Sequence, residues 1–539
     1  MAPAPIERTP LLKAALKDEQ SHVLGPRQLL IVFPALALVQ FISLLDQTAV
    51  STALPAIADR LHTGSSISWV GASFLISSTS VQLVNGRLSD IFGRKACLIA
   101  ALAVMGLGNT LSGFARTPME LYATRAISGL GAGGINALVQ VTISDISTLE
   151  QRGNYFGIIG IFVALGNGLG PVIGGVLTGE ASWRWVFWSI SPMAALTIII
   201  LLLALPPSRV AGDIWTKLKM VDWLGVLVSL VAVVLILIPV SQGGSNIPWS
   251  SPMVVAMLSA GVALCVAFVL LEWRVVRLPI IPMHLFTSGY SANILLAQNI
   301  AIGWVYWGNL FYLPLYFQNV RGWDPIKAGT LILPMVIAHG IFSGLSGFLV
   351  SWTGRYWPVI VTGAAVWTVT TGCKALYTQH TPVWVFVVLG IFDGFGIGFC
   401  FQPVLVALLA NSNKADCAVM TGLRNFLRAM GGAVGITVSG AILSNVLQSG
   451  LRDRFPPEVI AGLTSNVLDL PRTNLSEEDQ QLILSVYMRG LHAVFVSYAP
   501  LIGLCFLSSL LVTNYPVGRK VMSERQRQKQ PDRGDEPVN

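Results

Sequence analysis

Apolar runs of about twenty residues recur along the chain, separated by short polar loops. A helix that crosses the hydrocarbon core of a bilayer needs about 20 predominantly apolar residues, so each run predicts one membrane-spanning helix. By this rule the sequence predicts about fourteen spans, near residues 29–52, 68–85, 96–115, 119–141, 155–178, 185–205, 223–241, 252–271, 291–317, 326–352, 357–378, 383–410, 417–446 and 488–513. The fold class expected is therefore an all-α integral membrane protein.

The composition supports a membrane protein and argues against other classes. Of the 539 residues, 53% are hydrophobic and 11% are charged, whereas soluble globular chains carry about 25% charged residues. The first twenty residues are polar and show no cleavable signal peptide. The six cysteines lack the spacing of a metal site, so we expect no metal and no cofactor.

The basic residues indicate orientation rather than nucleic-acid binding. The chain holds 34 Lys and Arg against 26 Asp and Glu, and most bases lie in alternate short loops between the apolar runs. An even number of spans puts both tails on one side, and the excess of bases on that side makes it cytoplasmic. The long loop 449–486 then faces the other side, where Asn474-Leu475-Ser476 is an N-glycosylation sequon.

Two segments of the chain repeat. GRLSDIFGRK at 86–95 aligns with GFLVSWTGRY at 347–356, at an offset of 261 residues. At an offset of 265, residues 157–175 align with residues 422–440 and share four glycines and an alanine. Several matches in nearly one register indicate a duplication. Parallel repeats of membrane helices are typical of transporters that rock one half against the other around a midplane site.

The duplication divides the chain into parts. We expect two six-helix halves with two extra helices between them and a tail at each end. The predicted parts are the N-terminal tail 1–28, the first half 29–205, the linker with two extra helices 206–271, the second half 272–513 and the basic tail 514–539.

Asp46 places a carboxylate inside the first apolar run. Such a group costs roughly 2.5–3.5 kcal/mol at the centre of a lipid-spanning helix and marks a functional site by default. At a rise of 1.5 Å per residue, Asp46 and Arg125 of the fourth span lie roughly 9–14 Å from the same end of the bundle. The two charges could pair. Either Asp46 takes up and releases a proton during transport, or the pair is permanent and structural; we favour the proton.

The loop between the second and third spans carries a cluster of charges and two glycines: Gly86, Arg87, Asp90, Gly93, Arg94 and Lys95. This loop resembles the signature loop of the major facilitator superfamily. The resemblance implies that it braces the two halves and that its Asp-centred ion pairs break and re-form as the carrier alternates. The second copy has Ser351 in place of Asp90, so the charge network is expected in the first half.

Three further segments resemble family motifs: LDQTAVSTALP in the first span, RAISGLGAGGI in the fourth and GNGLGPVIGG in the fifth. The last resembles the antiporter motif and consists of Gly166, Asn167, Gly170, Pro171, Gly174 and Gly175. With about fourteen spans, the nearest resemblance is to the fourteen-helix drug:proton antiporter branch of fungal type. Independently, glycines at every fourth position clear one helix face for a close neighbour.

Other polar or aromatic residues within the spans could line a substrate cavity. The candidates are Gln140, Asn299, Trp307, Asn309, Asp393 and Gln402. An apolar cavity with few polar groups suits an amphipathic organic substrate. Each of these residues could equally serve helix packing.

The resemblance implies a proton-coupled exporter of small amphipathic organic molecules such as drugs, toxins or secondary metabolites, active as a monomer in the lipid bilayer. The alternatives are a vacuolar transporter of basic amino acids and an iron-chelate transporter. A channel or a transceptor is a less favoured function. The sequence shows no enzyme motif and no nucleotide-binding domain, so we do not expect this protein to be an enzyme. The plasma membrane is expected, although Glu7, Leu11 and Leu12 form an acidic dileucine pattern that would direct the protein to a vacuole.

Overall fold

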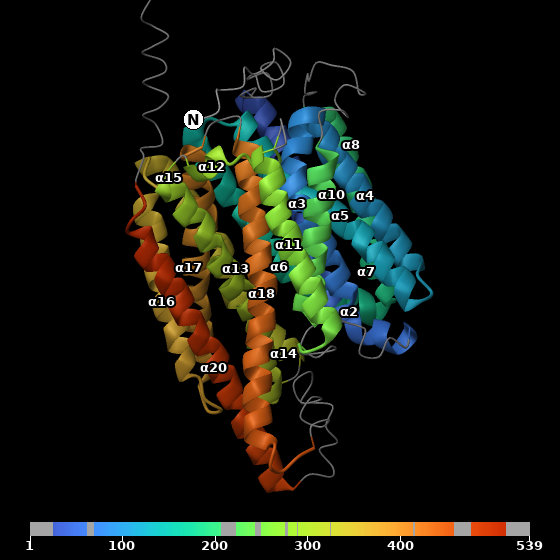
Figure 1. Ribbon diagram of the computed structural model, residues 1–539, viewed down its shortest axis with the longest axis vertical. Helices are drawn as coiled ribbons and strands as arrows, with labels where there is room; N and C mark the ends of the chain where they lie inside the picture. The colour runs from blue at the N-terminus through green and yellow to red at the C-terminus, as the bar shows by residue number, and fades with distance from the viewer. Residues whose placement is uncertain are drawn as a thin grey trace, which may run out of the picture.

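The computed structural model describes residues 25–61, 69–205, 222–242, 249–274, 279–287, 289–323, 325–412, 416–456 and 476–513, which fold as an elongated bundle of helices (Figure 1). The first half contains α2 (Pro26–Leu61), α3 (Trp69–Phe92), α4 (Arg94–Phe114), α5 (Pro118–Ile146), α6 (Leu149–Glu180), α7 (Trp183–Trp188) and α8 (Ile190–Ala204). The extra helices are α10 (Trp223–Gln242) and α11 (Pro252–Arg274). The second half contains α12 (His284–Thr287), α13 (Tyr290–Leu315), the π-helix η2 (Tyr316–Val320), α14 (Pro325–Thr330), α15 (Leu333–Thr353), α16 (Trp357–Cys373), the 3₁₀ turn η3 (Lys374–Leu376), α17 (Val383–Ala410), α18 (Cys417–Leu451) and α20 (Glu477–Ser509).

Equivalent helices pack in the same way in each half. In the first half α2 packs on α6, α3 on α5 and α4 on both α5 and α8. In the second half α13 packs on α18, α15 on α17 and α16 on both α17 and α20. The pattern of helix contacts therefore repeats along with the sequence.

Two seams join the halves. α6 packs on α15 along one seam, and α3 packs on α18 along the other. The extra helix α10 covers the second seam: Val233 and Leu237 pack with Ile76 of α3 and against Phe426 and Met430 of α18. The extra helix α10 thus lies against the join between the halves, and α11 packs on α10 (Figure 1).

Twelve of the described helical segments are long and apolar enough to cross a membrane. Two more, α3 with 24 residues and α13 with 26, lie in the bundle but are not among those twelve. Both carry polar side chains, among them Gln82 and Arg87 in α3 and Asn299 in α13. The all-helical membrane fold is confirmed, but the count of fourteen spans is not.

Some helix boundaries differ from the expected ones. The last span, expected from 488, belongs to a helix that begins at Glu477, inside the loop expected over 449–486. Ser476 caps this helix by accepting a hydrogen bond from the amide of Asp479. The sixth span, expected as one run, is one candidate span over Trp183–Ala204, in which α7 and α8 meet at Ser189.

Candidate functional site

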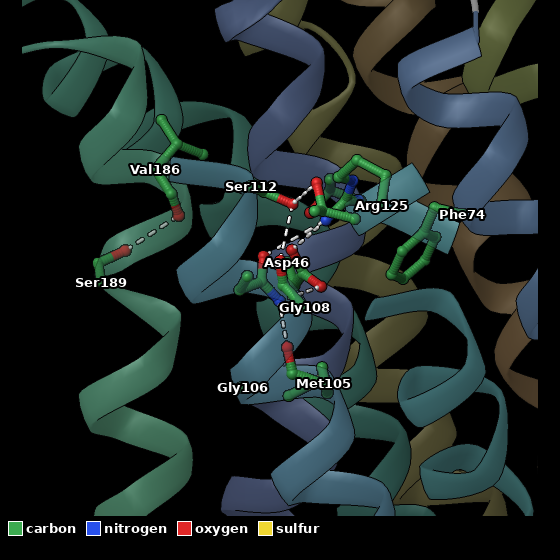
Figure 2. A network of polar contacts seen from close by, with 12 residues as sticks. Asp46, Phe74, Met105, Gly106, Gly108, Ser112, Arg125, Val186 and Ser189 are labelled. Carbon is green, nitrogen blue, oxygen red and sulfur yellow. Dashed lines mark hydrogen bonds and ion pairs between the residues drawn. The ribbon is translucent and has the colours of Figure 1, made fainter. Parts of the chain in front are cut away.

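Asp46 lies at the centre of a buried polar cluster in the first half (Figure 2). Arg125 Nη1 of α5 is 2.8 Å from Asp46 Oδ1, and both side chains are 1% exposed. Asn109 Nδ2 of α4 donates to Asp46 Oδ2 at 3.0 Å and to the carbonyl of Met105 at 3.0 Å. The pairing of Asp46 with Arg125, expected from their depth, is present in the structure.

Aromatic rings hold the Arg125 guanidinium in place. Its central carbon lies 4.3 Å from the centroid of the Phe74 ring and 5.5 Å from that of Phe187, within the range of a cation–π interaction. Figure 2 shows the Phe74 ring beside the guanidinium. Sequence analysis did not single out Asn109; its only signal was an amide within the third apolar run.

The signature loop forms a chain of ion pairs. Asp90 Oδ1 is 2.6 Å from Arg94 Nη2, and Arg94 Nε is 2.8 Å from Asp145 Oδ2 at the end of α5. Gly93 has φ of 96°, a conformation that favours glycine, which lets the chain turn from α3 into α4. Sequence analysis missed Asp145, although this acid closes the network.

Two basic residues of the same loop bond backbone carbonyls far away in the sequence, one in the second half and one at the end of the first half. Arg87 Nε donates to the carbonyl of Pro279, in the segment of the second half that precedes α12, at 2.8 Å. Lys95 Nζ donates to the carbonyl of Leu205 at 2.5 Å. A Cβ added to Gly86 would lie 2.9 Å from the carbonyl oxygen of Ala418 in α18, so glycine permits the close approach of the halves here.

A second buried ion pair lies in the second half. Lys374 Nζ pairs with Asp393 and donates to Asn309 Oδ1 at 3.0 Å. Asn309 follows Asp46 by 263 residues and Lys374 follows Asn109 by 265 residues, close to the offsets of 261 and 265 residues found for the repeat. The two halves therefore hold related clusters with different charges: an acid stands on α2 in the first, and an amide stands on α13 in the second.

The glycines of the antiporter motif face α2. A Cβ at Gly166 would lie 2.9 Å from Leu44 Cβ, and one at Gly170 or Gly174 would collide with Thr48 or Ala49. The predicted close contact between this helix face and a neighbour is present in the structure. Pro171 lies inside α6, and a Cβ on Gly175 would meet nothing within 4 Å.

The expected cavity residues lie in different surroundings. Asp393 and Asn309 belong to the ion-pair cluster of the second half and are 0% exposed. Gln140 lies at the join between halves, where its Oε1 accepts from Asn425 Nδ2 at 3.2 Å. The Oε1 of Gln402 is buried without a hydrogen-bond partner, Asn299 Nδ2 bonds the carbonyl of its own helix at Leu295, and Trp307 is half-buried.

Asn167 of the antiporter motif also joins the halves. Its Nδ2 donates to the hydroxyl of Tyr306 in α13 at 3.1 Å. The Tyr306 ring contacts that of Phe401, and Arg428 of α18 lies over the Phe401 ring. Arg424, one turn earlier on α18, donates to the carbonyl of Phe401; sequence analysis did not single out either arginine. The available signal was two bases four residues apart inside an apolar run.

Several expected sites lie outside the described residues: Asn474, Glu7, Leu11 and Leu12. Among the residues that the structure describes, no group of three or more His, Cys, Asp or Glu could hold a metal ion.

Comparison with solved structures shows the fold. The human organic anion transporter MFSD10 (TETRAN) aligns with a TM-score of 0.59 at 13% identity, over 90% of this chain and 100% of that one. The proton:xylose symporter XylE, a major facilitator superfamily protein, aligns with a TM-score of 0.57 at 15% identity, over 93% of this chain and 100% of that one.

Sequence comparison finds fungal relatives. Citrate exporter 1 of Yarrowia lipolytica is 38% identical over 92% of this chain and 74% of that protein. The MFS-type transporter clz4 of Cochliobolus lunatus is 34% identical, over 91% of this chain and 86% of that protein. The MFS-type efflux pump MMF1 of Pseudozyma antarctica is 30% identical, over 92% of each chain.

The family model described as the Major Facilitator Superfamily matches residues 36–436. The chain therefore belongs to the major facilitator superfamily, and its relatives are named as fungal transporters and efflux pumps.

Proposed function

We propose that the protein exports small amphipathic organic molecules and that protons moving down their gradient drive the export by alternating access. The observation that carries the proposal is the buried cluster of Asp46, Arg125 and Asn109. Asp46 is the acid of this cluster, and an intramembrane acid beside a cation can change its protonation as its surroundings change.

The contacts between the halves support alternating access. Near the Gly93 end of the bundle, the amide of Asn154 donates to Ser351 Oγ at 3.1 Å, and deeper in the bundle Gln140 bonds Asn425. The described structure is thus closed at the end where the signature loop lies. Opening this end requires that these contacts and the Arg87–Pro279 bond break, while the opposite end closes.

The proton step follows from charge. While Asp46 is ionised, its ion pair with Arg125 ties α2 to α5 by electrostatic attraction. A proton on Asp46 removes the negative charge and weakens this tie, because burying a cation without its anion is unfavourable. Proton binding and release thereby change how firmly the helices of the first half are held, which couples the proton gradient to the rocking of the halves.

The test is transport by the full-length protein in sealed liposomes with an imposed pH gradient. Candidate substrates are toxins, cationic dyes, iron chelates and basic amino acids. Gradient-driven flux that disappears with a proton uncoupler supports the proposal. Flux that ignores the gradient, or ion conductance without substrate movement, contradicts it and favours a channel.

A second candidate function is citrate export. It is favoured by the 38% identity to a protein named citrate exporter 1, over 92% of this chain. Labelled citrate belongs in the same assay. Gradient-driven movement of citrate but not of the amphipathic compounds would make this candidate the function.

The membrane is also part of the proposal. Both tails face the cytoplasm of a plasma-membrane protein, and the vacuolar membrane is the alternative. A fluorescent fusion tests the two: movement from the vacuole to the plasma membrane when Leu11 and Leu12 become Ala would show that the dileucine pattern is a vacuolar address.

A further inference from the structure

Two arginines lie one helical turn apart on α18, within the membrane-spanning part of the second half. Arg424 is 0% exposed and Arg428 is half-buried. They follow the start of α18 by seven and eleven residues, which at 1.5 Å per residue is roughly 10–17 Å. That depth is about the middle of a hydrocarbon core of about 30 Å, where carriers of this kind hold their substrates.

Neither arginine pairs with a carboxylate among the described residues. Arg424 donates to the carbonyl of Phe401 at 2.5 Å and to Asn425 Oδ1 at 3.1 Å, and its Nε has no hydrogen-bond partner. Arg428 makes a 3.4 Å contact with the same Asn425 oxygen and lies 4.8 Å above the ring of Phe401. The neutral groups around them leave two positive charges uncompensated.

Three other bases within the bundle are compensated by carboxylates. Arg125 pairs with Asp46, Arg94 with Asp90 and Asp145, and Lys374 with Asp393. A buried charge without a counter-charge is costly, by several kcal/mol for each ion. An anion that arrives from outside the chain would remove this cost at Arg424 and Arg428.

The repeat shows that the fold does not require these two charges. At the offset of 265 residues, Ile159 and Val163 of α6 occupy the positions equivalent to Arg424 and Arg428. α6 and α18 make equivalent packing contacts in their own halves, on α2 and on α13. Since apolar residues serve the packing in the first half, the arginines of the second half have another purpose.

The surroundings of Arg428 suit a small polar ligand. His339 is buried with its Nε2 unpartnered, and Gln402 is buried with its Oε1 unpartnered. Arg428 lies over the ring of Phe401, and the rings of His339, Tyr306 and Phe401 contact one another at 4.9–5.9 Å between centroids. Gln140 and Asn167 connect this group of residues to the first half.

We propose that Arg424 and Arg428 bind the carboxylate groups of an organic di- or tricarboxylic acid, and that this acid is the transported substrate. The inference rests on the proposed proton-driven export and on its second candidate substrate, an acid of the citrate class, in place of an amphipathic molecule; it adds the residues that would hold that acid. The planar guanidinium matches a carboxylate with two parallel hydrogen bonds, and two guanidiniums one turn apart match an acid with two or more carboxylates. Polar groups from the first half would then reach the substrate when the halves close on it.

With this assignment, the carrier binds the proton in one half and the anionic substrate in the other. The proton site, Asp46, lies on α2 in the first half, and the anion site lies on α18 in the second. Asp393, which could have bound a cationic substrate, is instead neutralised by Lys374.

The test is binding to the purified full-length protein in detergent, with no pH gradient. The probes are succinate, tricarballylate and the neutral triamide of tricarballylate, measured by calorimetry or by the rise in unfolding temperature. We expect at least one of the two acids to bind and the triamide not to bind. Arg428→Gln should weaken binding about tenfold or more, because it removes charge-assisted hydrogen bonds, and Arg428→Lys should weaken it less. Arg452→Gln, exposed at the end of the same helix, is the matched control and should leave affinity unchanged.

Absence of binding by both acids, equal binding of the triamide, or unchanged affinity in Arg428→Gln would overturn the inference. The comparison of the two acids with the triamide uses the unmodified protein, so it tests the inference even if a variant fails to fold. The double variant Arg424→Ile and Arg428→Val, which carries the residues of the first half, should fold and bind neither acid. Since binding needs no gradient, loss of proton-driven flux with acid binding intact would contradict the proposed export function alone.

Discussion

Arg125 of α5 donates a 2.8 Å hydrogen bond to Asp46 of α2, and each side chain is 1% exposed. Asn109 of α4 binds the other carboxylate oxygen at 3.0 Å. Three helices of the first half therefore converge on a single acid. Its protonation changes the charge balance at their junction.

Asp46→Asn should abolish proton-driven transport while the protein still folds. The amide keeps the shape of the side chain and can accept from Arg125, but it cannot take up a proton in the physiological range. The measurement is pH-gradient-driven flux in liposomes, with protein folding checked by size-exclusion chromatography. Asp59→Asn, at an exposed position of the same helix, is the control and should retain flux. Undiminished flux in Asp46→Asn would make the ion pair structural.

Gly170→Val should loosen the packing of α6 on α2. A Cβ at Gly170 already collides with Thr48, and overpacking of this kind typically costs 1–3 kcal/mol. The thermal unfolding temperature in detergent should fall. Gly175→Ala in the same motif is the control, since nothing lies within 4 Å of the added carbon. Equal unfolding temperatures for the two variants would argue against the packing role of this glycine face.

Lys374→Met should destabilise the second half strongly. It leaves Asp393 buried without its counter-charge, which typically costs 3–5 kcal/mol. Adding Asp393→Leu should recover most of the lost stability, because removing both charges of a buried pair is often neutral. The unfolding temperatures of the two single variants and the double variant measure the coupling. Failure of the double variant to recover stability, together with loss of substrate binding, would indicate that Asp393 contacts the substrate.

Cysteines at positions 153 and 351 should lock the carrier. A Cβ on Gly153 of α6 would lie 2.6 Å from Ser351 Oγ of α15, so Gly153→Cys with Ser351→Cys brings two thiols together across the join of the halves. Oxidation should then stop transport, and reduction should restore it. The single variants, oxidised in the same way, serve as controls. Unimpaired transport by the fully cross-linked protein would contradict opening at the Gly93 end.

The class of the protein could be predicted from local sequence alone. Apolar runs long enough to span a bilayer require helices there, because backbone polar groups in lipid must bond within their own segment. The depth of Asp46 and Arg125 along their helices could also be counted from the sequence, and the predicted pair is present. The glycine face of α6 was visible from its four-residue spacing, although the sequence did not identify α2 as its partner.

The tertiary structure alone decided which partners the polar and charged side chains have. Asn109, Asp145, Lys374 and Arg424 all lie in or beside apolar runs and look alike in sequence. In the bundle, Asn109 binds Asp46, Asp145 closes the loop network and Lys374 neutralises Asp393, whereas Arg424 meets no carboxylate among the described residues. The physical reason is geometric: the length of a helix and the depth of each residue follow from local sequence, but the neighbour that a side chain meets depends on the rotation and packing of helices far apart in the chain.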